Sequence, residues 1–207
     1  PMNNSSSIHE IHLPSSLIEL KEGWCAGTKD LTKIFISQSN NNFMVKDNKY
    51  LFGKSDNNKD EFDVLEFVAR DTNEITIPSN IKIIASNAFQ CSKINSISIP
   101  SNVTKICEKA FFDCSNLRKV EIPTNSNLQT IESYAFSYSK IKEISIPSNV
   151  IKICEYAFSC CYELLIIEIS EDSKLQWIQE SIFEGCSDLI IMIPISLKKL
   201  IQTINNS

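Results

Sequence analysis

The sequence predicts an α/β solenoid, in which short coils stack into a single curved parallel sheet with short helices on the convex side. The stretch ISIPSNVTKICEKAF at 97–111 returns as ISIPSNVIKICEYAF at 144–158. A third segment at 120–136, VEIPTNSNLQTIESYAF, lies between them with the same apolar skeleton. Composition points the same way, because 32 isoleucines accompany only four glycines. The turns between coils must therefore depend on Pro, Ser and Asn.

An isoleucine that precedes a proline, or Ser170 in one copy, marks a period of 22 to 24 residues. The markers are Ile77, Ile99, Ile122, Ile146, Ile169 and Ile193. Upstream, Leu13 and Ile36 continue the series. A period of about 20 to 29 residues that is rich in Leu or Ile is typical of leucine-rich repeats.

The unit at 97–120 shows how each coil is predicted to fold. Ile97 and Ile99 alternate with Ser98, so a strand places both isoleucines on one face. Pro100 fixes φ and lacks a donor, which ends the strand. The apolar residues that follow keep a helical rhythm: Val103, Ile106, Ala110, Phe111 and Cys114. One unit cannot bury its apolar face alone, so like side chains must stack in columns through neighbouring coils.

Two columns of side chains are predicted for the core. The aromatic column is Phe89, Phe111, Phe136, Phe158 and Phe183. A second column holds Cys91, Cys114, Cys161 and Cys186, with Tyr138 in the middle coil. We interpret these cysteines as buried thiols, with a disulfide between neighbours such as Cys91 and Cys114 as the alternative. Metal binding is disfavoured, because the chain has no CxxC and its two histidines, His9 and His12, lie far from every cysteine.

The repeat breaks between 37 and 74, and the two ends of the chain differ from the coils. Two segments, FMVKDNKYLFG and FDVLEFVAR, flank the polar turn KSDNNKDE and predict an inserted β-hairpin at about 43–70. We expect 1–10 to be a disordered or vector-derived N-terminus and 11–200 to be one repeat domain. The segment 197–207 is predicted to form an amphipathic helix that caps the last coil.

Charge and hydropathy exclude several classes of function. The net charge is −5 and the basic residues are scattered along the sequence without a stripe, so no nucleic-acid partner is expected. No apolar run is long enough to span a membrane. The first residues, PMNNSSSIHE, show neither the basic nor the apolar region of a signal peptide.

No site for catalysis or a cofactor is predicted. The run NKYLFGKS at 48–55 differs by one residue from a phosphate-binding loop, because Asn48 stands where the first glycine is needed. Asp56, Asn58 and Asp60 have the spacing of a calcium loop but lack its glycine bend and bidentate glutamate. Weak calcium binding stays an alternative to a solvated turn. No acid, base and nucleophile converge, so the protein is expected not to be an enzyme and to need no cofactor.

The predicted binding surface is the concave face of the sheet, formed by residues that alternate with the buried isoleucines. These residues are Lys33, Phe35, Glu74, Thr76, Ser96, Ser98, Lys119, Glu121, Glu143, Ser145, Ile166 and Glu168. A broad, rigid face suits a protein or an extended polymer better than a small substrate. Phe35 and Ile166 are apolar at exposed positions, where they anchor a partner or are covered by the hairpin or a neighbouring chain. End-to-end or face-to-face homo-oligomers are compatible with this surface.

The pattern IxIPSNVxxIxxxAFxxC with a step of 23 residues resembles the BspA-like, or Treponema-type, leucine-rich repeat family over about 11–200. The segment YLFGKSDNNKDEFDVLEFVARD is similar to one found in BspA-like surface antigens of trichomonad protists. The resemblance implies a non-enzymatic adhesion or protein-binding module of a cell-surface or secreted protein in host–parasite interaction. Its partner would be a protein of the host cell surface or extracellular matrix. The alternative is a cytoplasmic scaffold that uses the same face for a cytosolic partner, because the sequence shows no signal peptide or anchor.

Overall fold

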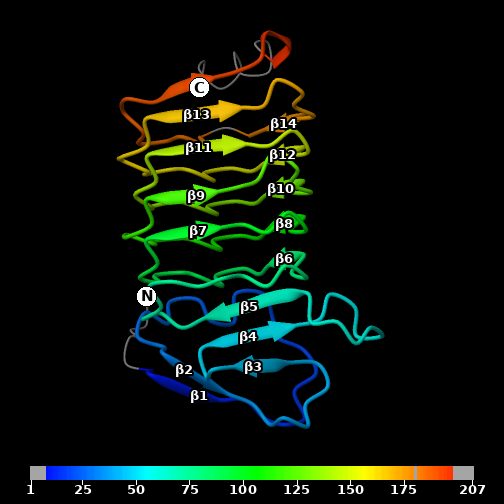
Figure 1. The fold of residues 1–207 in the computed structure, drawn as a ribbon. Helices are drawn as coiled ribbons and strands as arrows, with labels where there is room; N and C mark the ends of the chain where they lie inside the picture. The colour runs from blue at the N-terminus through cyan, green and yellow to red at the C-terminus, as the bar shows by residue number, and fades with distance from the viewer. Residues whose placement is uncertain (1–7, 180, 198–207) are drawn as a thin grey trace.

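The computed structural model describes residues 8–179 and 181–197 and shows a β-solenoid of stacked coils (Figure 1). Two rows of short strands run along the stack. The first row is β1 (Glu10–His12), β2 (Lys33–Phe35), β7 (Ser96–Ser98), β9 (Lys119–Glu121), β11 (Glu143–Ile146), β13 (Ile166–Ile169) and β15 (Ile190–Met192). All pairs within this row are parallel. This row is the strand row that the isoleucine markers predict.

A second row forms one sheet of eight strands, so the prediction of a single sheet is wrong. In spatial order it contains β14 (Trp177–Ile178), β12 (Lys152–Ile153), β10 (Thr130–Ile131), β8 (Lys105–Ile106), β6 (Ile83–Ile84), β5 (Val64–Val68), β4 (Tyr50–Gly53) and β3 (Met44–Lys46). The strands from β5 to β14 pair in parallel and lie beside the first row in Figure 1. The four coils from Ser96 to Ile178 thus each contribute two strands separated by turns.

The predicted stacking of like residues is confirmed. In the first row Ile97 pairs with Val120, and Ile144 pairs with Ile167. The phenyl rings form a continuous stack, with centroids 4.6 Å apart for Phe89 and Phe111, then 5.0, 5.3 and 6.0 Å along the column to Phe183. The first four rings of this column are fully buried. Repetition of the sequence therefore makes each coil complementary to the next.

The predicted convex helices are wrong, because the only helix among the described residues is the short 3₁₀ helix η1 (Ile195–Leu197). Each arc instead contains two residues with positive φ, four positions apart, such as Lys109 and Asp113. The N–H of Phe111 donates to Ala135 of the next coil at 2.7 Å, whereas the N–H of Ala110 donates within its own coil, to Cys107. Alternate N–H groups thus bond between coils, which leaves no i to i−4 helical ladder. The helical rhythm indicated which side chains face inward, not the backbone conformation.

The predicted cysteine column is also corrected. Ser92, not Cys91, lies under Cys114, with their side chains 3.5 Å apart. In the middle coils Ser139, not Tyr138, lies beside Cys161 at 3.3 Å. From Ser92 to Cys161 the column therefore alternates hydroxyl and thiol groups, and Cys186 ends it with a second thiol, which donates to Phe158 as Cys161 does to Phe136. The Sγ atom of Cys114 also donates to the carbonyl of Phe89 at 3.0 Å, so these polar groups are satisfied inside the core.

The segment at 43–70 forms three antiparallel strands, so the predicted first arm of the hairpin is not one strand. It contains β3 and β4, joined by a turn in which Asp47 and Asn48 both have positive φ. Two residues of this kind are typical of a tight hairpin turn, because Asp and Asn tolerate the left-handed conformation. β4 then pairs with β5, and β5 continues the sheet of the coils through β6. The segment is thus part of the second row.

The hydrophobic core has two parts. The larger part runs through the coils from Phe52 to Ile182, and the smaller part is N-terminal and includes Cys25, Phe43 and Phe67. Arg70 lies at the junction, with only 1% of its surface exposed. The two terminal predictions, a free segment at 1–10 and a capping helix at 197–207, lie mostly outside the described residues. Within those segments the structure shows β1 from Glu10 and the end of η1 at Leu197.

Glu66 on β5 is a half-buried carboxylate in the three-stranded segment. Gly53 on β4 makes room for it, because a Cβ atom at Gly53 would lie 2.6 Å from Oε1 of Glu66. Burial raises the pKa of Glu66 from 4.5 to about 7. The folded state therefore favours the protonated carboxyl, and the stability that this provides is complete below pH 4.5 and is lost as the pH rises to about 7.

We expect Glu66→Gln to raise the free energy of unfolding by about 2 to 3 kcal/mol at pH 8, because the amide carries no charge to desolvate. At pH 4.5 the gain should be close to zero, since the native carboxyl is then already protonated. Urea unfolding of both proteins at the two pH values measures the difference. Glu19→Gln, at an exposed position, is the matched control and should change little. An equal effect of Glu66→Gln at both pH values would contradict the prediction.

Candidate functional site

The exposed face of the first strand row contains a groove that crosses several coils. One hollow of about 720 Å³ is lined by residues of β7, β9, β11 and β13, among them Lys119, Glu143 and Ile166. A second, of about 740 Å³, is lined by Glu74, Thr76 and residues of β7 and β9. The two hollows share Ser98, Lys119 and Glu121, so together they form one groove along the face. We call this surface the strand-face groove.

Polar contacts within and between coils orient the side chains of the groove. Lys119 and Glu121 form an ion pair at 2.6 Å, and Ser98 donates to Glu121 at 2.7 Å. The bond to Glu121 raises the pKa of Lys119, and the bonds from Lys119 and Ser98 lower the pKa of Glu121. Two coils further along the stack, Ser145 donates to Glu168 at 3.2 Å. These contacts arise because every second residue of each strand points outward in register with its neighbour.

Ten of the twelve residues predicted for the binding face line the groove, and two lie apart from it. Lys33 and Phe35 are on β2, which pairs with β1 in a separate two-stranded sheet. Phe35 is half-buried and stacks on His12, with ring centroids 4.6 Å apart. Its side chain is therefore partly covered by β1.

The same face extends to residues that were not predicted. Ile190 and Met192 on β15 pair with Ile166 and Glu168 on β13, and they are 61% and 52% exposed. Glu10 and His12 occupy the equivalent positions on β1. The sequence pattern contained a signal for all four. Two lie three residues and one residue before the marker Leu13, and the other two lie at the same distances before the marker Ile193. Extending the alternation to the end markers would have found them.

Burial makes three of the cysteines unreactive. All eight are free thiols, and burial raises the pKa of Cys107, Cys114 and Cys161 to about 12. A thiol with such a pKa is protonated near neutrality and is a poor nucleophile. Among residues 8–179 and 181–197, no three His, Cys, Asp or Glu side chains are placed to hold a metal ion.

The polar turn between β4 and β5 is held by its own side chains. Asp56 accepts hydrogen bonds from the backbone and side-chain nitrogens of Asn58 at 3.0 and 3.1 Å, and it pairs with Lys59 at 3.7 Å. The carboxylate of Asp63 accepts hydrogen bonds from the backbone N–H and hydroxyl of Ser55, both at 2.8 Å. This geometry is that of a solvated turn, without the helix that a phosphate-binding loop needs.

The BspA type leucine-rich repeat region matches the sequence in six copies, which cover residues 2–59, 66–164 and 122–207. The chain belongs to this family. The match extends over nearly the whole sequence and confirms the resemblance that the repeat pattern indicated. No curated protein sequence matches the chain significantly.

Several solved bacterial structures share the fold. A leucine-rich cell surface protein from Faecalibacterium prausnitzii A2-165 is 22% identical with a TM-score of 0.79, over 95% of this chain and 50% of its own. The pneumococcal vaccine antigen PcpA is 22% identical with a TM-score of 0.75, over 89% of this chain and 44% of its own. The leucine-rich repeat protein of T. pallidum is 19% identical with a TM-score of 0.56, over 77% of this chain and 95% of its own. The BspA-type chain thus spans about half the length of the first two.

Leucine-rich repeat proteins of this kind are generally binding scaffolds, and the family points to protein partners. In the part of the chain that the structure describes, no helix has the length and hydropathy needed to cross a bilayer.

Proposed function

We propose that this BspA-type repeat protein is a non-enzymatic adhesion or recognition module of a surface protein, which binds a protein partner through the strand-face groove. The groove itself carries the proposal. It continues across four strands of the first row, about 14 Å at the usual spacing between strands. Such a long, open surface suits an extended or broad partner, because a small ligand is normally enclosed on most sides.

The chemistry of the groove supports a specific contact. Its charged side chains are already oriented by the bonds that join Lys119, Glu121 and Ser98, so a partner loses little side-chain entropy on binding them. Ile166 and, beyond it, Ile190 and Met192 add an exposed apolar end. Apolar anchors beside ordered polar groups are typical of protein interfaces.

Charge reversal within the groove tests the proposal. The partner is first captured from surface proteins and identified. The triple variant Lys119→Glu, Glu121→Lys and Glu143→Lys should then bind it with an affinity lower by on the order of tenfold or more. The loss is expected because reversed charges repel the groups that the native groove attracts. The dissociation constants of wild type and variant for the purified partner give the result.

The control carries three reversals away from the groove: Lys152→Glu, Glu155→Lys and Glu171→Lys. All three positions are exposed, and the change in net charge is the same as in the groove variant. Its affinity should stay within about twofold of wild type. Unchanged binding by the groove variant would place the site on the convex side or on the 43–70 segment.

Surface location is part of this proposal. It is supported by the similar structures from F. prausnitzii and pneumococcus, which are described as a cell surface protein and a vaccine antigen. Antibody labelling of intact, unpermeabilised cells that express the natural gene should stain their surface. Staining only after permeabilisation would overturn this part of the proposal and leave the groove test unaffected.

A further inference from the structure

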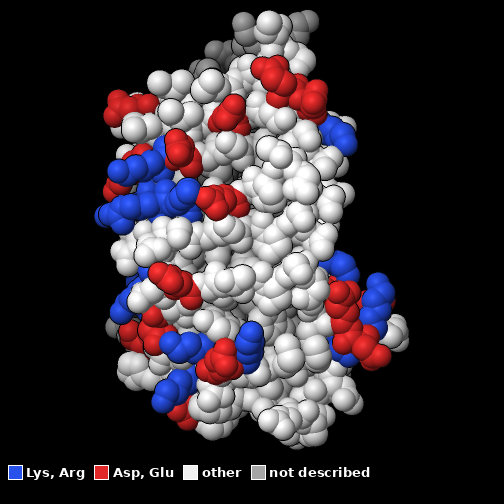
Figure 2. Space-filling view, viewed as in Figure 1, with Lys and Arg blue, Asp and Glu red and all other residues white. Residues whose placement is uncertain are grey.

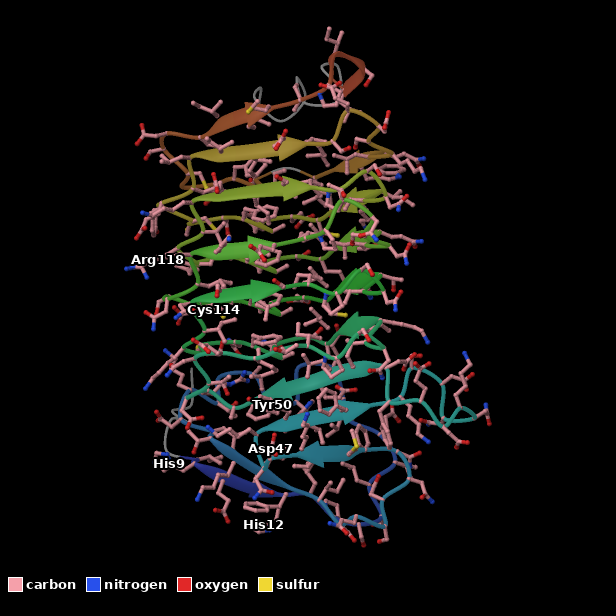
Figure 3. All side chains as sticks on the ribbon, in the orientation of Figure 1. His9, His12, Asp47, Tyr50, Cys114 and Arg118 are labelled. Atoms are coloured by element: carbon pink, nitrogen blue, oxygen red, sulfur yellow. The ribbon has the colours of Figure 1, made fainter. Side chains whose placement is uncertain are left out.

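Basic residues that are scattered along the sequence meet at one edge of the strand face. Lys93, Arg118, Lys140 and Lys142 come from three consecutive coils, and all four are exposed. Figure 2 shows the largest gathering of Lys and Arg on the visible face at its left edge, level with β9 and β11. The side chain of Arg118 extends outward from this edge in Figure 3. We call these four residues the basic edge.

Backbone hydrogen bonds align the basic edge in two columns. The N–H of Arg118 donates to Asn95 at 2.9 Å, and the N–H of Lys142 donates to Arg118 at 3.4 Å. The second column follows from the same register. Its members each stand one residue before a buried apolar residue such as Ile94, Leu117 or Ile141, and they are Lys93, Asn116, Lys140 and Glu163. Lys140 and Glu163 lie 3.8 Å apart, as this column requires.

Three of the four cations are not neutralised by the protein. Among residues 8–179 and 181–197, no carboxylate lies within 4.0 Å of the nitrogen atoms of Lys93, Arg118 or Lys142. Arg118 and Lys142 lie on adjacent coils, about 4.8 Å apart at the backbone, so their charges repel. A bound polyanion would relieve this repulsion. The edge is notable because the chain as a whole has a net charge of −5.

We propose that the basic edge binds a sulfated polysaccharide. Two exposed asparagines accompany the cations: Asn116 lies between Lys93 and Lys140 in the second column, and Asn95 precedes Arg118 in the first. Amide groups donate and accept hydrogen bonds, so the edge offers sites for hydroxyl groups between sites for anionic groups. A sulfated sugar chain carries both groups in alternation, whereas an acidic peptide in extended form presents carboxylates without hydroxyls. The three coils span about 10 Å, which fits a few sugar units.

The surface is suited to reversible binding that depends on salt. Lys and Arg at this edge are solvated and flexible, so each contact with a sulfate contributes modestly and is screened by ions. Affinity should therefore come from several contacts together and fall as salt rises, as it does for other polyanions whose counterions are released on binding. The basic edge borders the strand-face groove but shares none of its residues.

A heparin octasaccharide is the probe, measured by isothermal titration at about 50 and about 200 mM salt. Wild type should bind, and its affinity should fall at the higher salt. The double variant Arg118→Glu and Lys142→Glu should lose on the order of tenfold or more in affinity at the lower salt. Desulfated, N-acetylated heparin should bind wild type much more weakly than heparin.

The matched control is Lys21→Glu with Lys46→Glu. Both positions are exposed, lie in the N-terminal part of the chain and give the same change in net charge. This control should keep wild-type affinity within about twofold. Equal loss in both double variants, or no heparin binding by wild type at the lower salt, would overturn the proposal. Binding of a polyglutamate peptide as tightly as heparin would overturn it in favour of an acidic protein segment.

Discussion

Phe136→Ala should lower the free energy of unfolding by about 3 to 5 kcal/mol. The ring is fully buried and stacks on both neighbours, with centroids 5.0 Å from Phe111 and 5.3 Å from Phe158. Truncation removes the transfer free energy of the ring and leaves a cavity that rigid neighbouring coils cannot fill. The position lies in the middle of the column, so the loss weakens two interfaces between coils at once. Urea unfolding followed by circular dichroism measures the change.

An exposed aromatic residue of the next coil provides the comparison. Tyr162 is 68% exposed and contacts Tyr138 edge to face at 6.4 Å. Tyr162→Ala should cost less than about 1 kcal/mol, because little apolar surface returns to water. A loss below about 1 kcal/mol for Phe136→Ala would contradict the aromatic stack as the main support of the coils.

The isoleucine period predicted the strand row and its register, because one exposed residue alternates with one buried residue in every coil. The arcs could not be predicted in the same way. A spacing of three and four residues indicates which side chains face inward, but two residues per arc with positive φ set the backbone conformation. In most arcs these residues are not glycine and are chemically varied, for example Lys109, Tyr134 and Cys160, although Gly185 occupies one such position and Gly23 and Gly27 have the same spacing. Hydrogen bonds to the next coil hold them there, and those bonds exist only in the stack.

The functional surfaces were likewise predicted only in part from the sequence. The markers located Lys119, Glu121 and Glu143 on one face, since face position depends only on local alternation. The ion pair of Lys119 with Glu121 and the bond from Ser98 depend on rotamers that the fold selects. The basic edge was missed although its residues keep a constant register: Arg118 and Lys142 lie four residues before a marker isoleucine, and Lys93 and Lys140 lie six residues before one. Only the positions one and three residues before each marker were assigned to the exposed face, so this signal was not used.

Arg70 is the residue least expected from the sequence, because arginines are rarely buried without a carboxylate partner. Its guanidinium donates to five backbone carbonyl groups: those of Cys25, Thr28, Val68, Asn87 and Ala88. Its plane also lies over the Phe67 ring, 4.6 Å from the centroid. Elsewhere in the stack a backbone N–H bonds to the next coil, as Phe89 does to Ala110. Where the 37–74 segment interrupts the repeat, the guanidinium of Arg70 supplies the donors that backbone N–H groups supply between regular coils.

Arg70→Met should therefore lower the free energy of unfolding by about 3 to 5 kcal/mol, because several buried carbonyls lose their donor and methionine offers none. The N-terminal core should open first. In a Trp177→Phe background, fluorescence of Trp24, which contacts Phe67, should change at lower urea than circular dichroism of the whole chain.

Arg70→Lys should recover only part of the loss, since an ammonium cannot reach five carbonyls with planar geometry. Arg118→Met, at an exposed arginine, should cost less than about 0.5 kcal/mol. Coincident transitions and a loss below about 1 kcal/mol for Arg70→Met would show that the two cores join without this side chain.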